Sequence, residues 1–215
     1  MTPFAQSLRQ TQILILEILG IFLWLKFSSS LTLNKTDHFS KVSPYLRSKG
    51  GVCSDIRMKI GVLSDTHLHR VTKEFKEIYE TYLSDKDVIL HAGDVVSSEL
   101  IDFLSRKRFY GVYGNMDSVE VREILPSKNV IELGAYRLGI IHGWGSSDDL
   151  EDRIWPEFQN VDVIVYGHSH RAANHIRDDV LFFNPGTATG FGFSGVHSIG
   201  VLELDDAVHG KIIIL

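Results

Sequence analysis

Five short apolar runs, each followed at once by a polar signature, constrain the fold of this chain more than any other feature. The runs occupy residues 60–63, 88–90, 109–113, 138–141 and 161–166. Short runs rich in β-branched and aromatic residues are typical of buried strands. The signatures at their ends are SDTH, HAGD, YGNMD, IHG and YGHSH. Polar side chains are therefore predicted where each strand meets its loop.

Seven side chains in these signatures could bind a metal ion, and their order favours one shared site. They are Asp65, His67, Asp94, Asn115, His142, His168 and His170. The first candidate in each signature follows the one before it after 29, 21, 27 and 26 residues. Most of these intervals suit a strand, a crossover and the next strand, because a parallel connection needs a dozen or more residues. In an open α/β sheet such loops meet in one crevice at the carboxyl edge.

Helical periodicity supports this arrangement. Apolar residues recur at helical spacing over 75–82 and 100–104, within the first two intervals. Asp148, three residues before Glu151, predicts the start of a third helix. Pro156 should kink or shorten that helix. The sequence thus predicts an α/β fold.

The chain changes in character at Met58. Residues 1–57 hold none of the signatures, whereas residues 58–215 hold them all and have the length of one domain. The first part has 7 Lys and Arg against 3 Asp and Glu, and the second has 15 against 24. Because an acidic domain repels a polyanion, we expect no binding to nucleic-acid duplexes. Divalent cations would be needed to make an Asp-rich site attract phosphate.

The status of residues 1–57 is a separate question. Residues 13–25 are apolar except for Glu17, which makes the stretch too short and too charged for a membrane span. A secretory signal or anchor is the weaker alternative, since only Arg9 precedes the stretch and no clear cleavage site follows it. We expect that the native protein starts at Met58, that the preceding segment reflects an upstream start codon, and that residues 58–215 contact no membrane. Cys53, the only cysteine, excludes an intramolecular disulfide, which fits a cytoplasmic enzyme.

The chemistry of the candidate ligands indicates which metals they would bind. Imidazole and carboxylate without thiolate suit Mn²⁺, Zn²⁺, Fe or Ni²⁺ rather than Ca²⁺. Seven ligands are too many for one ion, whereas two cations about 3.5–4 Å apart can clamp a phosphoryl group and acidify a water molecule. A carboxylate that binds both ions would give each of the two ions four of the seven ligands. Asp94, in the middle of the set on a Gly93–Asp94 turn, is the best candidate for this bridge.

The ordered series DTH, GD, GN, H and GHSH resembles the calcineurin-like metallophosphoesterase superfamily over residues 58–215. The short length and the sequence GNMD in place of GNHD are most similar to the small YfcE-type prokaryotic phosphodiesterases. The resemblance implies a four-layer αββα fold, a β-sandwich with flanking helices, with late strands at 180–183, 198–204 and 211–215. It also implies two divalent metal ions, with Mn²⁺ our first choice.

The resemblance also implies a division of the ligands. The first metal would be held by Asp65, His67, Asp94 and His170, and the second by Asp94, Asn115, His142 and His168. Asp94, Asn115 and His142 are in addition our candidate catalytic residues. The loop at 184–187 matches a further family loop, for which we expect a structural role. We also expect the glycine-rich residues 186–195 to form a loop rather than a phosphate cradle.

One departure from the superfamily concerns proton transfer. Met116 occupies the position of a histidine that is thought to protonate the leaving group, and a thioether cannot do so. Asp117 is then either a substitute acid or a turn former. His91 is expected to lie in the core or to orient a ligand.

The expected function is that of a metal-dependent phosphodiesterase acting on small phosphodiesters. Three alternatives remain at this stage. They are a phosphomonoesterase, a non-catalytic interaction scaffold such as the eukaryotic retromer subunit of the same fold, and a mononuclear two-His-one-carboxylate iron oxygenase. The retromer subunit lacks part of the ligand set, and the oxygenase leaves Asn115 and two histidines without a role. The sequence is compatible with a homo-oligomer.

Overall fold

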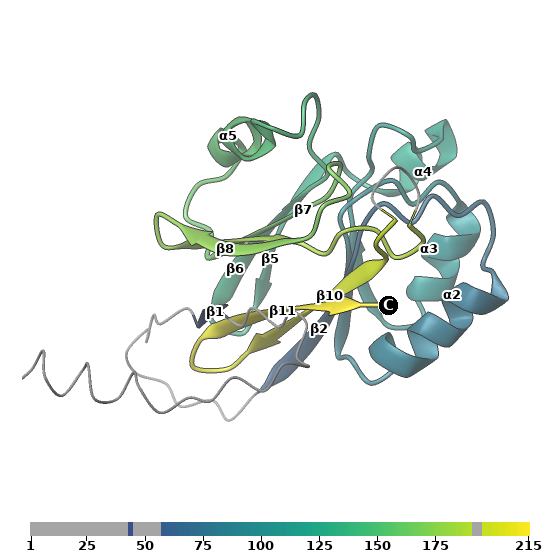
Figure 1. Ribbon diagram of the computed structural model, residues 1–215, viewed down its shortest axis with the longest axis horizontal. Coiled ribbons are helices and arrows are strands. Elements are labelled where there is room, and N and C mark those ends of the chain that lie inside the picture. Colours follow the sequence, from purple (N-terminus) through teal and green to yellow (C-terminus); the bar gives the residue numbers. More distant parts are fainter. Residues whose placement is uncertain (1–42, 45–56, 191–194) are drawn as a thin grey trace, which may run out of the picture. The chain divides into compact units, whose positions relative to one another are not determined.

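The structure is a computed structural model that describes residues 43–44, 57–190 and 195–215, all within the compact unit Ser40–Leu215. Its centre consists of two mixed sheets (Figure 1). The first has the order β1-β11-β10-β2-β3-β4, with β1 at Ser43–Pro44, β2 at Met58–Leu63, β3 at Val88–His91, β4 at Arg108–Gly111, β10 at Ser198–Leu204 and β11 at Val208–Ile214. The second has the order β5-β6-β7-β9-β8, with β5 at Lys128–Leu133, β6 at Tyr136–Ile141, β7 at Val163–Tyr166, β8 at Ala173–Arg177 and β9 at Val180–Asn184.

The central strands are apolar on both faces because both faces are covered. In β2 and β3, Ile60 and Leu90 pack toward the second sheet, whereas Leu63 and Ile89 pack toward helices. In β7, Val163 and Val165 join the core between the sheets, and the intervening Ile164 faces outward. Such continuous apolar strands are typical of parallel sheets buried on both sides.

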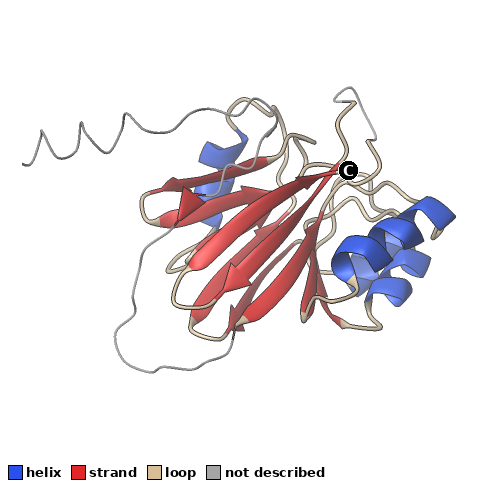
Figure 2. Cartoon of the chain, turned by 60° about the horizontal axis from the view of Figure 1, so that its bottom comes forward, coloured by secondary structure: helices blue, strands red, loops and turns tan. Residues whose placement is uncertain are grey.

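Helices complete the outer layers (Figure 2). The first sheet is covered by α2 at Lys73–Ile78, which continues as the π-helix η1 at Tyr79–Leu83, by α3 at Ser98–Leu104 and by α4 at Val119–Ile124. The side chains of Thr72, Ser97 and Ser118 cap the N-termini of α2, α3 and α4. The second sheet is covered by α5 at Leu150–Ile154 and the 3₁₀ helix η2 at Trp155–Glu157. The four-layer αββα fold is thus confirmed.

Several local expectations need correction. The polar signatures follow strands of two sheets rather than strands of one open sheet, because β6 and β7 belong to the second sheet. The third helix begins at Leu150, with Asp149 rather than Asp148 in the N-cap position and without a side-chain capping bond. Glu151 does not return to the helix start because its carboxylate instead binds the Tyr166 hydroxyl and lies 3.0 Å from His175 Nε2. The 3₁₀ turn at Pro156 agrees with the expected shortening.

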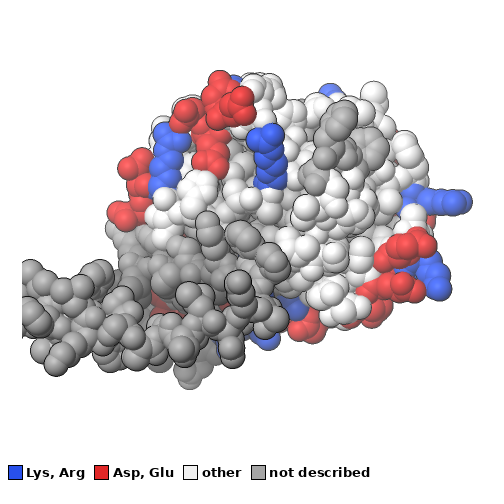
Figure 3. Space-filling view, viewed as in Figure 1, with Lys and Arg blue, Asp and Glu red and all other residues white. Residues whose placement is uncertain are grey.

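Other expectations lie partly outside the described residues. These include Cys53, residues 13–25 and the stretch 191–194 of the glycine-rich segment. Within the segment before Met58, Ser43–Pro44 pairs with β11. None of the helices in the described ranges is long and apolar enough to cross a membrane. In the view of Figure 3, acidic and basic side chains are interspersed and acidic ones gather near α5.

Candidate metal centre

The five loops at the carboxyl ends of β2, β3, β4, β6 and β7 bring the seven candidate ligands together. Two backbone hydrogen bonds join the first two loops, from Asp65 N to Gly93 O and from His67 N to Asp94 O, each 3.0 Å long. Gly167 N, at the end of β7, donates to His142 O at 3.2 Å and joins the loops of the second sheet. The ligands therefore meet because the strands beneath them are parallel neighbours.

One group of ligand atoms is centred on Asp65. Its Oδ1 atom lies 3.1 Å from His170 Nε2 and 4.0 Å from His67 Nε2. The two histidine Nε2 atoms are 3.4 Å apart. Asp65 is fully buried. These three residues form a cluster whose ligand atoms are close enough to hold one metal ion.

A second group shares Asp65 and adds Asp94 and His142. Asp94 Oδ2 lies 3.4 Å from His142 Nε2 and 3.6 Å from His67 Nε2, so that one carboxylate oxygen faces a histidine of each group. Its other oxygen, Oδ1, accepts a hydrogen bond of 2.8 Å from Met116 N. This bond fixes the orientation of the carboxylate.

Asn115 and His168 extend the second group. Asn115 Oδ1 lies 3.2 Å from His142 Nε2 and 3.0 Å from His168 Nδ1. The opposite ring nitrogens face backbone carbonyls, with His142 Nδ1 2.8 Å from Ala92 O and His168 Nε2 2.8 Å from Gly145 O. A carbonyl can only accept, so these contacts place the ring protons away from the site in the neutral imidazoles. The lone pairs of His142 and His168 then point toward Asn115, as in metal-binding histidines.

The backbone is strained at most of these positions. Five of the seven candidates have a positive φ: 50° at Asp65, 47° at His67, 56° at Asp94, 68° at His168 and 55° at His170. A residue other than glycine in this region costs about 1–3 kcal/mol and persists only where surrounding contacts enforce it. Such strain concentrates at functional sites, which supports a functional reading of the cluster.

Two glycines allow the loops to approach the carboxylates. A Cβ atom at Gly114 would lie 2.2 Å from Asp94 Oδ1, and one at Gly167 would lie 2.7 Å from Asp65 Oδ2. Both distances are too short for any side chain. The glycines in GNMD and GHSH are therefore required by packing against the carboxylates.

Asp117 fixes two loops through its buried carboxylate. Oδ2 accepts from Asp94 N at 3.0 Å and from Gly114 N at 2.7 Å, and Oδ1 accepts from Val96 N at 2.5 Å. Burial raises the pKa of Asp117, although these backbone hydrogen bonds oppose the rise. Because both oxygens accept N–H groups, we interpret Asp117 as a clamp between loops rather than as a substitute acid.

His91 contacts the loop that carries Asp94 and the loop that carries Asp65. Its Nδ1 atom accepts from Gly93 N at 3.2 Å, and its Nε2 atom lies 3.1 Å from Thr66 Oγ1. The Gly93 contact requires a lone pair on Nδ1, so the ring is neutral with its proton on Nε2. Burial lowers the pKa of His91 to about 3. His91 is thus a buried support of the loop that carries Asp94, in agreement with the expectation of a core or orienting residue.

The loop at 184–187 has the structural role that was expected. Asn184 Nδ2 donates to Gly167 O at 3.0 Å, and Thr187 Oγ1 donates to Asp65 O at 2.8 Å. The loop therefore ties the GHSH segment to the SDTH segment. Ser64, which sequence reasoning did not single out, donates to Asp65 Oδ2 at 2.6 Å. Its position directly before Asp65 is the signal that could have identified it.

The charges and hydrogen bonds of the cluster fit a divalent cation. Asp65 Oδ1 is buried and accepts no hydrogen bond from the described residues. Burial lowers the pKa of His67, which favours the neutral form that binds metals. Burial also acts to lower the pKa of His142, but Asp94 and Asp65 outweigh it and raise the pKa overall. The surroundings of His142, Asp94 and Asp65 therefore favour a positive charge. The oxygen and imidazole donors suit a transition-metal ion.

Comparison with known proteins places this geometry in a family. Residues 58–207 match the calcineurin-like phosphoesterase superfamily domain. A probable metallophosphoesterase of Methanocaldococcus jannaschii is 34% identical over 160 residues, covering 73% of this chain and 81% of the relative. A phosphodiesterase of the same organism is 29% identical over 171 residues, covering 73% of this chain and 99% of the relative.

Solved structures show the same fold. A structure described as a novel archaeal phosphodiesterase has a TM-score of 0.61 at 26% identity, covering 74% of this chain and all of that one. Vps29 of Chaetomium thermophilum has a TM-score of 0.62 at 23% identity, covering 74% and 89%, and supports the fold alone. The matched domain, the convergent ligand atoms and the relatives agree: this chain belongs to the calcineurin-like phosphoesterase superfamily.

Proposed function

We propose that the protein is a divalent-metal-dependent phosphodiesterase with a dinuclear centre that hydrolyses small phosphodiesters. The observation that carries this proposal is the meeting of two ligand groups around the buried oxygens Asp65 Oδ1 and Asp94 Oδ2. The names of the Methanocaldococcus relatives support a phosphoester substrate, and one of them supports a diester.

The ligand assignment divides the cluster into two sets. Asp65, His67, Asp94 and His170 would hold one cation, and Asp94, Asn115, His142 and His168 would hold the other. Asp94 is our choice for the bridge because Oδ2 faces His67 and His142 at 3.6 and 3.4 Å. Asp65 is the rival, since Oδ1 also lies 3.9 Å from His142 Nε2. We propose Mn²⁺ as the native ion, with Zn²⁺, Ni²⁺ and Fe as candidates of the same ligand chemistry.

The chain itself prepares the site for hydrolysis. When bound, the cations would supply Lewis-acid polarisation of the phosphoryl group and would acidify a water molecule. The protein's contribution is to hold Asp94, Asn115 and His142 in one geometry. Met116 N fixes Asp94, Ala92 O fixes the His142 ring, and Asp117 joins the loop of Asp94 to the loop of Asn115. Asp94 and His142 are therefore each oriented by a second contact before substrate arrives.

Metal content and turnover on the same sample test the proposal. Purified protein loaded with Mn²⁺ should contain two ions per chain and hydrolyse bis-p-nitrophenyl phosphate faster than the monoester p-nitrophenyl phosphate. A single ion would favour the oxygenase, and two ions with preference for the monoester would favour a phosphomonoesterase. An inert protein without stoichiometric metal would favour a scaffold, the alternative that the Vps29 structures keep open. The exposed Asp148→Asn variant serves as the control for Asp94→Asn.

A further inference from the structure

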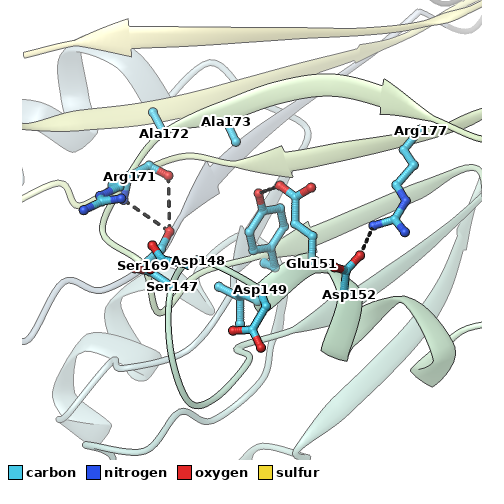
Figure 4. A pocket seen from close by; sticks show the side chains of 12 residues that line it. Ser147, Asp148, Asp149, Glu151, Asp152, Ser169, Arg171, Ala172, Ala173 and Arg177 are labelled. Carbon is cyan, nitrogen blue, oxygen red and sulfur yellow. Dashed lines mark hydrogen bonds and ion pairs between the residues drawn. The ribbon is translucent and has the colours of Figure 1, made fainter.

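Two of the cavities lined by described residues differ in chemistry. The first is lined by Asp148, Asp149, Glu151 and Asp152 together with Arg171 and Arg177 (Figure 4). Most of these charges already have partners: Arg177 binds Asp152, Arg153 binds Asp149, and Tyr166 donates to Glu151. The side chains that line this cavity are mostly acidic and are paired with neighbouring side chains. They therefore offer few favourable contacts to an ester substituent of an anionic phosphodiester.

The second cavity opens directly on the proposed second metal set. Its lining includes Asn115 and His142, and Tyr113, Ile141 and Trp144 contribute apolar side chains. Its volume is about 350 Å³. This is near the lower end of the range for small-molecule sites, about 300–1,000 Å³, which suits a single substituent of nucleoside size. A phosphoryl group bound at Asn115 and His142 would have this space beside it.

Trp144 is presented to solvent rather than packed in the core. The residue is 45% exposed, and its indole N–H has no hydrogen-bond partner within the described part of the chain. Its backbone is nevertheless fixed, since Arg153 Nε donates to Trp144 O at 2.8 Å and Arg153 also binds Ser146 O. The next residue, Gly145, accepts from His168. The loop thus holds an exposed indole at a defined place two residues after His142.

The charges around the cavity indicate which group the indole would meet. Lys128 lies 2.7 Å from Glu157 Oε2, which neutralises both. Arg122 remains as an additional positive charge, held by bonds to the carbonyls of Asp117 and Asn115. A cation such as choline is therefore disfavoured, although indole alone would accept one. A neutral planar group that stacks on the indole fits the cavity best.

We propose that this cavity is the subsite for a nucleoside arm of the substrate and that Trp144 determines the specificity by stacking on the base. The proposal rests on the phosphodiesterase function and adds to it the class of diester: one ester arm carries a nucleobase. The phosphate would lie at the metal centre and the base against Trp144, and no covalent step beyond hydrolysis is involved.

Binding of product-like monoesters tests the subsite without relying on turnover. Calorimetry on the full-length, Mn²⁺-loaded protein would compare thymidine 5′-monophosphate, methyl phosphate and phosphocholine, which share the phosphate and differ only in the arm. We expect the nucleotide to bind about tenfold or more tightly than methyl phosphate, the contribution typical of base–aromatic stacking, and phosphocholine to gain nothing. Equal dissociation constants for all three, or tighter binding of phosphocholine than of the nucleotide, would overturn the proposal.

Variants of Trp144 test whether its indole causes the preference for the nucleotide over methyl phosphate. Trp144→Ala should reduce the ratio of nucleotide to methyl phosphate affinity to near one, and Trp144→Phe should retain most of it. Val130→Ala, which removes an exposed apolar side chain from β5, is the control and should keep the ratio. An unchanged ratio in Trp144→Ala with normal metal content would refute the assignment. Turnover of bis-p-nitrophenyl phosphate, measured in parallel, separates the two proposals: selective nucleotide binding without hydrolysis would refute the hydrolase and leave the subsite.

Discussion

At the scale of single residues, the charge of Asp94 is the feature on which the proposed centre depends most. If Oδ2 spans both ions, Asp94→Asn removes a negative charge shared by two sites, whereas His170→Ala removes one neutral ligand. We therefore expect Asp94→Asn to lose at least about 10²- to 10³-fold in kcat and to lose metal from both sites. His170→Ala should lose less and retain the second ion. The measurements are kcat/KM on bis-p-nitrophenyl phosphate and the number of ions per chain.

Asp65→Asn completes this comparison because Asp65 is the rival bridge. The variant should release the first ion more readily than the second if Asp94 is the bridge. Near-normal turnover by Asp94→Asn with two bound ions would contradict our assignment. Loss of both ions from Asp65→Asn alone would transfer the bridging role to Asp65.

Met116 leads to a prediction about leaving groups. Its side chain is 57% exposed next to Asn115, and a thioether carries no proton to donate. Asp117 is poorly placed to substitute because both of its oxygens accept backbone N–H groups. General acid catalysis typically contributes about 10²- to 10⁴-fold, so diesters with acidic phenols should be strongly preferred over alkyl esters.

The test of this preference is kcat/KM across diesters of graded leaving-group pKa, with chemistry shown to limit the rate. The wild type should show a steep dependence, and Met116→His should make it shallower. A flat profile in the wild type would mean that another group donates the proton.

Because His91 is buried, we expect the free energy of unfolding to depend on pH in a defined way. Its pKa is about 3 in the fold, against 6.5 for the ordinary side chain. Between these values the unfolded chain binds a proton that the folded chain excludes, so the stabilisation is complete above pH 6.5 and decreases as the pH falls. We expect this residue alone to remove about 2 kcal/mol of unfolding free energy between pH 7 and pH 5.

Urea unfolding of the wild type and of His91→Gln from pH 5 to 8 measures this effect. The difference between the two profiles isolates His91, because every other side chain is common to both proteins. His69→Gln, at an exposed position, is the matched histidine control. Parallel profiles for wild type and His91→Gln would show that His91 is not held neutral.

At the scale of secondary-structure elements, the loops after β3 and β4 depend on Asp117. Asp117→Ala leaves the N–H groups of Asp94, Val96 and Gly114 without their acceptor. We expect a loss of about 1–3 kcal/mol in unfolding free energy and a metal affinity about 10- to 100-fold weaker. Denaturant unfolding and metal titration measure both, with Asp148→Ala as the control. Unchanged metal affinity combined with a selective loss of activity on alkyl esters would instead identify Asp117 as the acid.

The sequence predicted strands better where they are buried on both faces than where they lie at an edge. The runs that became β2, β3, β6 and β7 are continuous in apolar residues, and each was recognised. β8 was not recognised, because at the edge of its sheet Ala173–Arg177 is only partly buried and carries no apolar run. The start of α5 was misplaced because the partner of Glu151, Tyr166, lies on β7, 15 residues away in the sequence.

In the site, too, residues within short motifs could be predicted, whereas contacts between distant loops could not. All seven candidate ligands could be named from short signatures, because each signature is contiguous in the sequence. The contacts of Asn184 could not, since its hydrogen bond to Gly167 O joins the ends of β9 and β7, 17 residues apart in the sequence. The strain at Asp65 and His168 was equally invisible, because a positive φ leaves no mark in residue identity outside glycine.

At the scale of the whole molecule, residues 58–215 contain every candidate ligand and every strand of the two sheets except β1. β2 starts at Met58 and pairs with β10 and β3 in the centre of the first sheet. The segment before it contributes the two residues Ser43–Pro44, which pair with β11. Each backbone hydrogen bond that such a short pairing adds is worth only about 0.5–1.5 kcal/mol net.

We therefore expect a shortened chain of residues 58–215 to fold, bind metal and turn over as the full chain does. Its melting temperature should lie within about 2–6 °C of that of the full chain, since 1 kcal/mol shifts Tm by about 2–4 °C at this size. Thermal unfolding, metal content and kcat/KM of both chains provide the comparison. A shortened chain that aggregates or binds no metal would show that the preceding segment is part of the domain. The intact mass of the protein from its own cell tests the origin of the segment, because a species retaining residues 1–57, or cleaved within them, would contradict a native start at Met58.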